Sequence, residues 1–230
     1  MSRRLYTLCG ADPDCRFSPH CWKAVMALAH KGLDFEEVPT PFTAIPGIEG
    51  GFSRTVPVLS DDGRLLRDSF QIALYLEETY SARPSLFRGE GGMALSRFVE
   101  GYSQRLIHTS LMRIILKDIH DRLAPADQAY FRESREKLLG MTLEDVDARA
   151  DAELEALGDR LGPMRHLLKY QPFLGGEGPL FADYILFGAF QWARVSSPKP
   201  LLRTGDVVHD WFERCLDLHD GRGRAMKAAA

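Results

Sequence analysis

A serine, a proline, a histidine and a cysteine stand together in the segment RFSPHCWK, at residues 16–23. Ser18 suits the N-cap of a helix because its hydroxyl can accept a backbone N–H. Pro19 suits the first helical position, where its missing N–H would have no partner anyway. A hydroxyl at the positive end of a helix can also donate a hydrogen bond to a sulfur anion. The pattern therefore predicts a helix that starts here, with either a plain cap or a thiolate site at its first turn.

The four cysteines are Cys9, Cys15, Cys21 and Cys215, and they show no paired C-x-x-C spacing of the kind that binds zinc. We therefore expect no metal site and a reducing, cytoplasmic location. The start MSRRLYTLCG is too short in its apolar part for a signal peptide, and no apolar run of membrane-spanning length follows. A formal charge of −3 without a long basic run argues against nucleic acid as a partner.

The elements that must position Ser18 alternate between strand and helix signals in the first ninety residues. One helical stripe, formed by Trp22, Val25, Met26 and Ala29, is expected to face a core. An Asp-Gly pair between two β-rich segments predicts a hairpin. The expected order is a strand at Leu5–Cys9, a helix from Ser18 stopped by Gly32, a strand at Leu33–Val38, a Pro- and Gly-rich passage with at most a turn or two of helix, a hairpin of TVPVL and RLLRD, and a helix at Ser69–Tyr80.

After Pro84 the strand signals vanish and helical spacing takes over. The periodic apolar segments are Met93–Leu123, Thr142–Leu161, Phe181–Val195 and Asp206–Leu218. We therefore expect a small α/β domain at residues 1–87 and an all-helical domain at residues 88–230.

With this order of elements, the S-P-H-C segment resembles the C-P-x-C motif of glutaredoxins, with serine in place of the nucleophilic cysteine. The chain as a whole resembles the cytosolic glutathione transferases. Three patterns carry the resemblance: Ser18-Pro19 at the first helix, Val56-Pro57 before the third strand, and Asp68-Ser69 at the helix after the hairpin. The resemblance implies a thioredoxin-like α/β domain that binds glutathione, an all-α C-terminal domain that supplies the second substrate's pocket, and a homodimer.

In a serine-type member of this family, Ser18 is expected to hold the thiolate of glutathione. A free cysteine thiol has a pKa of about 8.5, and lowering it by about two units needs roughly 2.7 kcal/mol of preferential thiolate stabilisation. A cysteine at position 18 would instead form a mixed disulfide, as in the omega-type members. Cys21 is then expected to be an inert core thiol and Cys15 a more exposed one. Tyr6 is a rival activator for which we favour a packing role, and His20 is expected on the helix surface.

The other glutathione contacts also follow from the resemblance. A cis peptide bond at Val56-Pro57 would let the Val56 backbone pair with the cysteinyl amide of glutathione, although a proline can also merely start a strand. Ser69 and its amide would bind the γ-glutamyl carboxylate while Asp68 meets the ammonium group, although a plain cap is the alternative. Arg54 is our candidate for the glycine carboxylate.

The second substrate is expected to be a hydrophobic electrophile, attacked by the glutathione thiolate. Tyr102, His108 and Met112 are candidate walls of its pocket, with core packing as the alternative for each. The segments CGADPDCRF, FSPHCWK and ALAHKGL look similar to the bacterial β-etherase branch, which cleaves aryl ethers with glutathione. Two other functions stay open: a non-catalytic protein that binds glutathione or a partner protein, and a thiol-disulfide reductase that uses Cys15 or Cys21.

One pattern of the family is incomplete. The helical domain of these proteins usually carries a Ser/Thr-x-x-Asp capping box before a buried helix. This chain reads GPLFADYILFG, with Asp183 present but Leu180 at the hydroxyl position. We expect Asp183 to cap or support the buried helix that follows.

Overall fold

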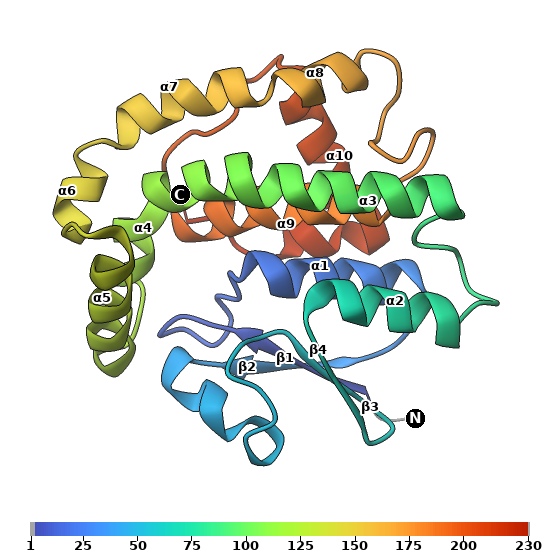
Figure 1. Ribbon diagram of the computed structural model, residues 1–230, viewed down its shortest axis with the longest axis horizontal. Helices are drawn as coiled ribbons and strands as arrows, with labels where there is room; N and C mark the ends of the chain where they lie inside the picture. Colours follow the sequence, from blue (N-terminus) through green and yellow to red (C-terminus); the bar gives the residue numbers. More distant parts are fainter. Residues whose placement is uncertain (1–2, 230) are drawn as a thin grey trace.

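A four-stranded mixed sheet forms the N-terminal part of the chain in the computed structural model, which describes residues 3–229 (Figure 1). The strand order is β2-β1-β3-β4, with β1 parallel to β2 and antiparallel to β3. The strands are β1 (Arg3–Leu8), β2 (Glu36–Thr40), β3 (Val58–Asp61) and β4 (Arg64–Arg67). The β3–β4 turn consists of Asp62 and Gly63, both with positive φ angles of 47° and 87°, and this confirms the predicted hairpin.

Two helices pack on one face of this sheet, between it and the helical remainder of the chain (Figure 1). They are α1 (Pro19–His30) and α2 (Ser69–Thr79), and a 3-10 segment, η1 (Phe42–Gly50), fills the Pro- and Gly-rich passage. Ser18 is the N-cap of α1 and Gly32 follows the helix with φ 61°, as the sequence predicts. The second strand begins at Glu36, three residues later than expected.

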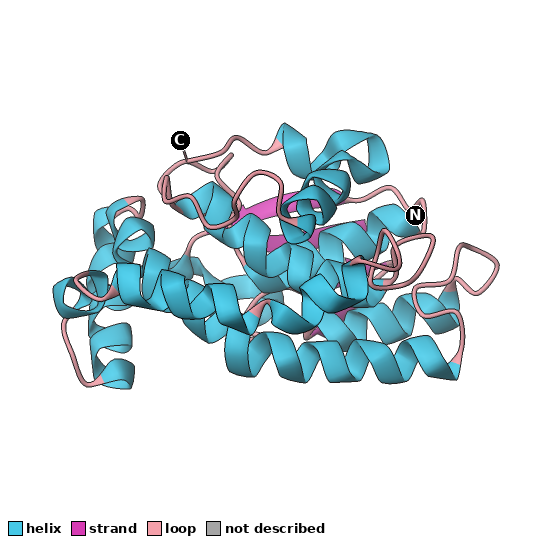
Figure 2. Cartoon of the chain, turned by 90° about the horizontal axis from the view of Figure 1, so that it is seen from above, coloured by secondary structure: helices cyan, strands magenta, loops and turns pink. Residues whose placement is uncertain are grey.

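Helices make up the second part of the chain, and from above they cover most of the sheet (Figure 2). They are α3 (Glu90–Tyr102), a π turn η2 (Ser103–Ile107), α4 (His108–Asp121), α5 (Pro125–Leu139), α6 (Leu143–Asp147), α7 (Ala150–Arg160), α8 (Gly162–Leu168), α9 (Phe181–Ser196) and α10 (Val207–Ala225). Every residue of α9 except Arg194 is buried, so this helix is the centre of the helical core. No helix within residues 3–229 is both long and apolar enough to cross a membrane.

Two expectations for the helical part need correction. The continuous helix expected at Thr142–Leu161 is two helices, α6 and α7, because the chain turns between residues 147 and 150. Helices α5 and α8 were not predicted. The exposed face of α5 carries so many charged side chains that its apolar spacing gives a weak signal, although Pro125 at its first turn and Gly140 after its last, with φ 68°, are helix-boundary residues.

A close approach between α1 and α9 joins the two parts of the chain. A β-carbon added to Gly188 would lie 2.3 Å from the carbonyl oxygen of Pro19, so only glycine permits this packing distance. Trp22 of α1 packs edge-on against Phe187 of α9, with ring centroids 6.0 Å apart. The first turn of α1, which carries Ser18, is therefore fixed against the buried central helix.

Asp183 supports the start of α9, as the sequence predicts. Its fully buried carboxylate accepts hydrogen bonds from the backbone N–H groups of Leu180 at 2.9 Å, Leu174 at 2.7 Å and Gly175 at 3.0 Å. The indole N–H of Trp211 donates a fourth, at 2.9 Å. Burial raises the pKa of this carboxyl group, and these hydrogen bonds oppose the shift. Leu180 supplies no side-chain cap, and the Asp183 carboxylate links the loop, the start of α9 and α10 through these four bonds.

Candidate active site

Ser18 lies at the edge of a cavity of about 970 Å³ between the sheet-bearing part and the helices. Its Oγ accepts the backbone N–H of Cys21 at 3.3 Å, and the residue is only 5% exposed. A hydroxyl that accepts one hydrogen bond still has its own proton to donate. Pro19 has no N–H, and the N–H groups of Cys21 and Trp22 donate to Ser18, so the His20 N–H is the first-turn donor left without a partner among the described residues. An anion placed beside Ser18 would be stabilised by the hydroxyl and by the N-terminus of α1.

The structure brings five of the predicted site residues to this one cavity: Ser18, Arg54, Val56, His108 and Met112. Three more do not line it, namely Pro57, Asp68 and Ser69. Pro57 directly follows Val56, and Asp68 directly follows Arg67, which pairs with Val58 across the hairpin. The remaining walls are mostly apolar and aromatic. The volume of the cavity is suitable for a drug-sized ligand.

The structure corrects the expectation for Tyr102, which does not line the cavity. Its hydroxyl donates to the carbonyl oxygen of Arg160, on the side where α7 packs. Tyr102 and His108 are six residues apart, which places them on different faces of one helical rod. Burial raises the pKa of the Tyr102 phenol to about 12, so it is a neutral packing residue.

His20 was expected on the helix surface; it is partly exposed, and the surface that it faces is the wall of the cavity. Its ring stacks on that of His108, with centroids 5.2 Å apart and planes at 24°. Sequence reasoning also missed Phe42, Arg135 and Trp192, which line the same cavity. Arg135 belongs to the unpredicted helix α5. The clue for His20 was its position two residues after Ser18, on the turn of helix that opens the site.

The Val56–Pro57 peptide bond is cis, as the sequence predicts. Within residues 3–229, no hydrogen bond engages the backbone N–H or carbonyl of Val56, so both groups are available to a ligand. Arg54, two residues earlier, is exposed and has no ion-pair partner among the described residues. This edge of the cavity therefore offers an unpaired backbone unit and an unpaired guanidinium group.

Asp68 is the N-cap of α2, and its carboxylate accepts the N–H groups of Phe70 at 3.0 Å and Gln71 at 2.9 Å. Its φ of 70° is unusual for a residue other than glycine, and such strain is common at ligand sites. Ser69 is 3% exposed, yet its hydroxyl has no hydrogen-bond partner among the described residues. The plain cap and a ligand site are both compatible with this corner.

The cysteines near Ser18 are not poised to ionise. Burial raises the pKa of the Cys21 thiol to about 12, outweighing the opposing effect of the Ser18 hydroxyl. Burial likewise raises the pKa of Cys15, which is half-buried, and raises that of Cys9 to about 11. Since the thiolate is the reactive form, these thiols are poor nucleophiles at neutral pH.

Tyr6 also lies outside the cavity. Its hydroxyl donates to a carboxylate oxygen of Glu49 at 2.6 Å, on η1. Burial, reinforced by that carboxylate, raises the pKa of the phenol. A phenol held neutral and turned toward η1 is not placed to hold a thiolate beside Ser18.

A buried lysine lies behind the first turn of α1. Lys23 is 2% exposed, and its Nζ has no hydrogen-bond partner within the described residues. Burial lowers the pKa of this amine to about 8, and the nearby carboxylates of Glu100 and Asp68 oppose the shift. This positive charge is close enough to His20 and His108 to lower the pKa of both imidazoles, in addition to the larger effect of their burial.

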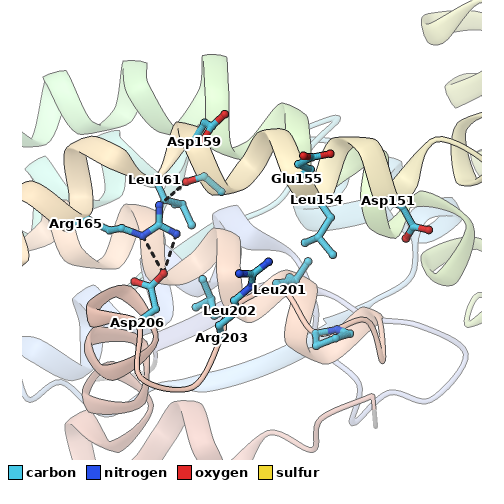
Figure 3. A pocket seen from close by; sticks show the side chains of 12 residues that line it. Asp151, Leu154, Glu155, Asp159, Leu161, Arg165, Leu201, Leu202, Arg203 and Asp206 are labelled. Carbon is cyan, nitrogen blue, oxygen red and sulfur yellow. Dashed lines mark hydrogen bonds and ion pairs between the residues drawn. The ribbon is translucent and has the colours of Figure 1, made fainter.

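A second cavity, of about 580 Å³, lies between α7, α8 and the loop before α10 (Figure 3). Arg165 of α8 crosses it, pairing with Asp206 at 2.7 Å and donating to the carbonyl of Gly158. Asp206 also accepts the N–H of Val208 at 2.9 Å and so caps α10. These polar groups satisfy one another, and we attribute to them a structural role in joining α8 to α10.

Within residues 3–229, no group of three or more His, Cys, Asp or Glu side chains is arranged to hold a metal ion. The polar groups that face the larger cavity are hydroxyls, imidazoles and guanidinium groups. They suit an organic anion better than a cation.

The fold and this cavity define a class of protein: a thioredoxin-like domain followed by a helical domain is the glutathione transferase architecture. A family model described as "Glutathione S-transferase, C-terminal domain" matches residues 94–222, and one described as "Glutathione S-transferase, N-terminal domain" matches residues 17–79. The chain belongs to the glutathione S-transferase family.

Two proteins of this family are similar to the chain in sequence. The "Glutathione S-transferase-like protein ustS" of Aspergillus flavus is 23% identical over 210 residues, which cover 77% of this chain and 74% of the relative. "Glutathione S-transferase Z1" of Arabidopsis thaliana is 32% identical over 106 residues, covering 43% of this chain and 42% of the relative.

Solved structures show the same fold. Glutathione transferase GSTFuA3 from Phanerochaete chrysosporium superposes with a TM-score of 0.78 at 25% identity, covering 100% of this chain and 99% of that one. The glutathione S-transferase CsGST63524 of Ceriporiopsis subvermispora, solved in complex with glutathione, has a TM-score of 0.75 at 22% identity, covering 98% and 95%.

Proposed function

We propose that this protein is a serine-type glutathione transferase, in which Ser18 stabilises the glutathione thiolate for attack on a hydrophobic electrophile. The position of Ser18 carries this proposal: its hydroxyl caps α1, keeps a proton to donate, and lines the mostly apolar cavity of about 970 Å³. The thiol proton leaves to solvent. The sulfur then forms a bond with the electrophilic carbon, and the leaving group departs with its electron pair.

The surrounding groups support a binding site for the rest of the tripeptide. The Val56 backbone, free of protein hydrogen bonds, would pair with the cysteinyl amide as an added strand does. The hydroxyl and backbone N–H of Ser69, at the N-terminus of α2, would donate hydrogen bonds to the γ-glutamyl carboxylate, and Asp68 would meet the ammonium group. Arg54 would bind the glycine carboxylate.

The pH dependence of turnover tests the proposal. With 1-chloro-2,4-dinitrobenzene as electrophile, we expect Ser18→Ala to raise the apparent pKa of kcat/KM by one to two units, and to lower kcat/KM at pH 7 by roughly 10- to 100-fold. Ser96→Ala is a matched control, because Ser96 is buried on α3 and donates to the carbonyl of Gly92, away from the cavity. An unchanged pH profile in Ser18→Ala would refute the assigned role.

Two other functions predict different results. A non-catalytic binding protein would bind glutathione in a calorimetric titration and turn over none of a panel of aryl ethers, epoxides, halides and disulfides. A thiol-disulfide reductase would reduce a model disulfide and lose this activity in Cys15→Ser or Cys21→Ser. The raised pKa of both thiols disfavours the reductase.

The likeness to the β-etherase branch remains a prediction, which the aryl ethers of that panel test directly. We also propose a homodimer and a domain boundary at residues 87/88. The two family matches, which end at residue 79 and resume at residue 94, support that boundary.

A further inference from the structure

Three rings from three different helices stack along one wall of the cavity. His20 of α1 stacks on His108 of α4 at 5.2 Å, and His108 lies against Trp192 of α9 at 4.7 Å with an angle of 32° between the planes. All three line the cavity. The wall is fixed at both ends, because Gly188 holds α9 against the first turn of α1.

The two imidazoles have unused hydrogen-bonding capacity. Among the described residues, neither His20 nor His108 has a hydrogen-bond partner for its ring nitrogens. Burial, and then the charge of Lys23, lowers the pKa of both rings, to about 4 for His108. A neutral imidazole carries one N–H donor and one acceptor nitrogen. Both rings are partly exposed to the cavity, so a polar atom of a bound ligand can reach them, and a ligand that covers the rings leaves them unsatisfied unless it supplies such an atom.

The rest of the cavity restricts which ligand can supply that atom. Phe42 stands at the centre of a second group of rings, 6.3 Å from Phe17, 5.9 Å from Tyr130 and 5.7 Å from Phe131. No carboxylate is present among the described side chains that line the cavity. Aromatic surfaces of this kind favour flat aromatic ligands.

We propose that His20 and His108 form a hydrogen-bonding site that selects flat aromatic second substrates carrying an oxygen or nitrogen atom. This inference rests on the proposed function, since it names the class of electrophile that the cavity accepts. The two imidazoles contribute to substrate recognition. They bind the polar atom of the substrate and thereby orient its aromatic ring beside Ser18. A purely hydrocarbon ligand of equal size would leave both imidazoles unsatisfied and would bind less tightly.

A pair of ligands of matched size tests the proposal without glutathione or turnover. Equilibrium dialysis would measure the affinities of 2-naphthol and 2-methylnaphthalene for the wild-type chain. We expect 2-naphthol to bind at least about fivefold more tightly, the effect of one net hydrogen bond. The double variant His20→Phe/His108→Phe keeps two flat rings and removes the nitrogens, and it should lose this preference while still binding 2-methylnaphthalene.

Two further variants separate recognition from folding. His166→Phe replaces a histidine on α8 outside the cavity and should keep the wild-type preference. His108→Asn keeps a donor and an acceptor, and it should retain more of the preference than His108→Phe. Equal affinity of the wild type for both ligands would overturn the proposal, even if the double variant failed to fold. A preference that survives in a folded double variant would overturn it as well.

The outcome is independent of the test of the proposed function. A preference for 2-naphthol together with an unchanged pH profile in Ser18→Ala would reject the role of Ser18 and support the role of His20 and His108. A shifted pH profile without the preference would support the role of Ser18 and reject that of the two histidines.

Discussion

The buried carboxylate of Asp183 offers the sharpest test of how the helical part is held together. It accepts four hydrogen bonds, from three backbone N–H groups and the Trp211 indole, and is fully buried. In Asp183→Ala all four donors would lose their acceptor. A buried donor left unsatisfied costs about 1–3 kcal/mol. Taking about 1 kcal/mol, the lower limit of this range, for each of the four donors, we expect Asp183→Ala to lower the free energy of unfolding by about 4 kcal/mol.

Asp183→Asn should cost about half as much, for a geometric reason. One carboxylate oxygen accepts from Leu174 and Trp211, and the other accepts from Gly175 and Leu180. The asparagine carbonyl can replace one oxygen, while its NH₂ group must face the other two donors. We therefore expect a loss of about 2 kcal/mol or slightly more.

Urea unfolding, followed by both tryptophan fluorescence and far-UV circular dichroism, would measure these losses. Asp159→Asn is the matched control, since Asp159 is exposed on α7, and its variant should stay within about 0.5 kcal/mol of the wild type. A destabilisation by Asp183→Ala of less than about 1 kcal/mol, or an Asn variant as stable as the wild type, would refute this account of the start of α9.

Two further predictions concern the α1–α9 contact and the response to acid. Gly188→Ala should lower the free energy of unfolding by about 1–3 kcal/mol in urea titrations, because the new β-carbon meets the Pro19 carbonyl. The control Gly158→Ala, in open space on α7, should be neutral or stabilising, and equal effects of the two variants would contradict the packing argument. Burial lowers the pKa of His219 to about 4 from 6.5, so the unfolded chain binds more protons between these values and stability should fall as the pH falls through this range. His219→Gln should flatten that dependence in urea titrations at several pH values, and exposed His166→Gln should not; a slope unchanged in His219→Gln would exclude the histidine as a contributor.

The sheet-bearing part could be predicted well because its signals are local. Ser18 and Pro19 mark a helix start by their own chemistry, and Asp62-Gly63 supplies the two positive φ angles of the hairpin. The cis bond before Pro57 was expected from the family pattern and is present. None of these depends on a distant part of the chain.

The cavity could be predicted only in part, because its walls come from helices that the sequence does not place relative to one another. His108 and Met112 were expected at the cavity and are there, but Tyr102 is directed to the α7 side. His20 resembles a surface residue until α4 and α9 are packed against it. Arg135 was missed because α5 has too polar a surface for its apolar spacing to be recognised.

The packing of α1 has a consequence for anyone who would recombine this chain with a relative. Helix α1 meets the strands on one side and α9 on the other, so nine of its residues are buried and it has almost no free face. A chimera that combines the sheet-bearing part of this chain with the helical part of a relative must therefore preserve the close packing of Pro19 against Gly188. Otherwise the substituted helix would displace Ser18 and the first turn of α1.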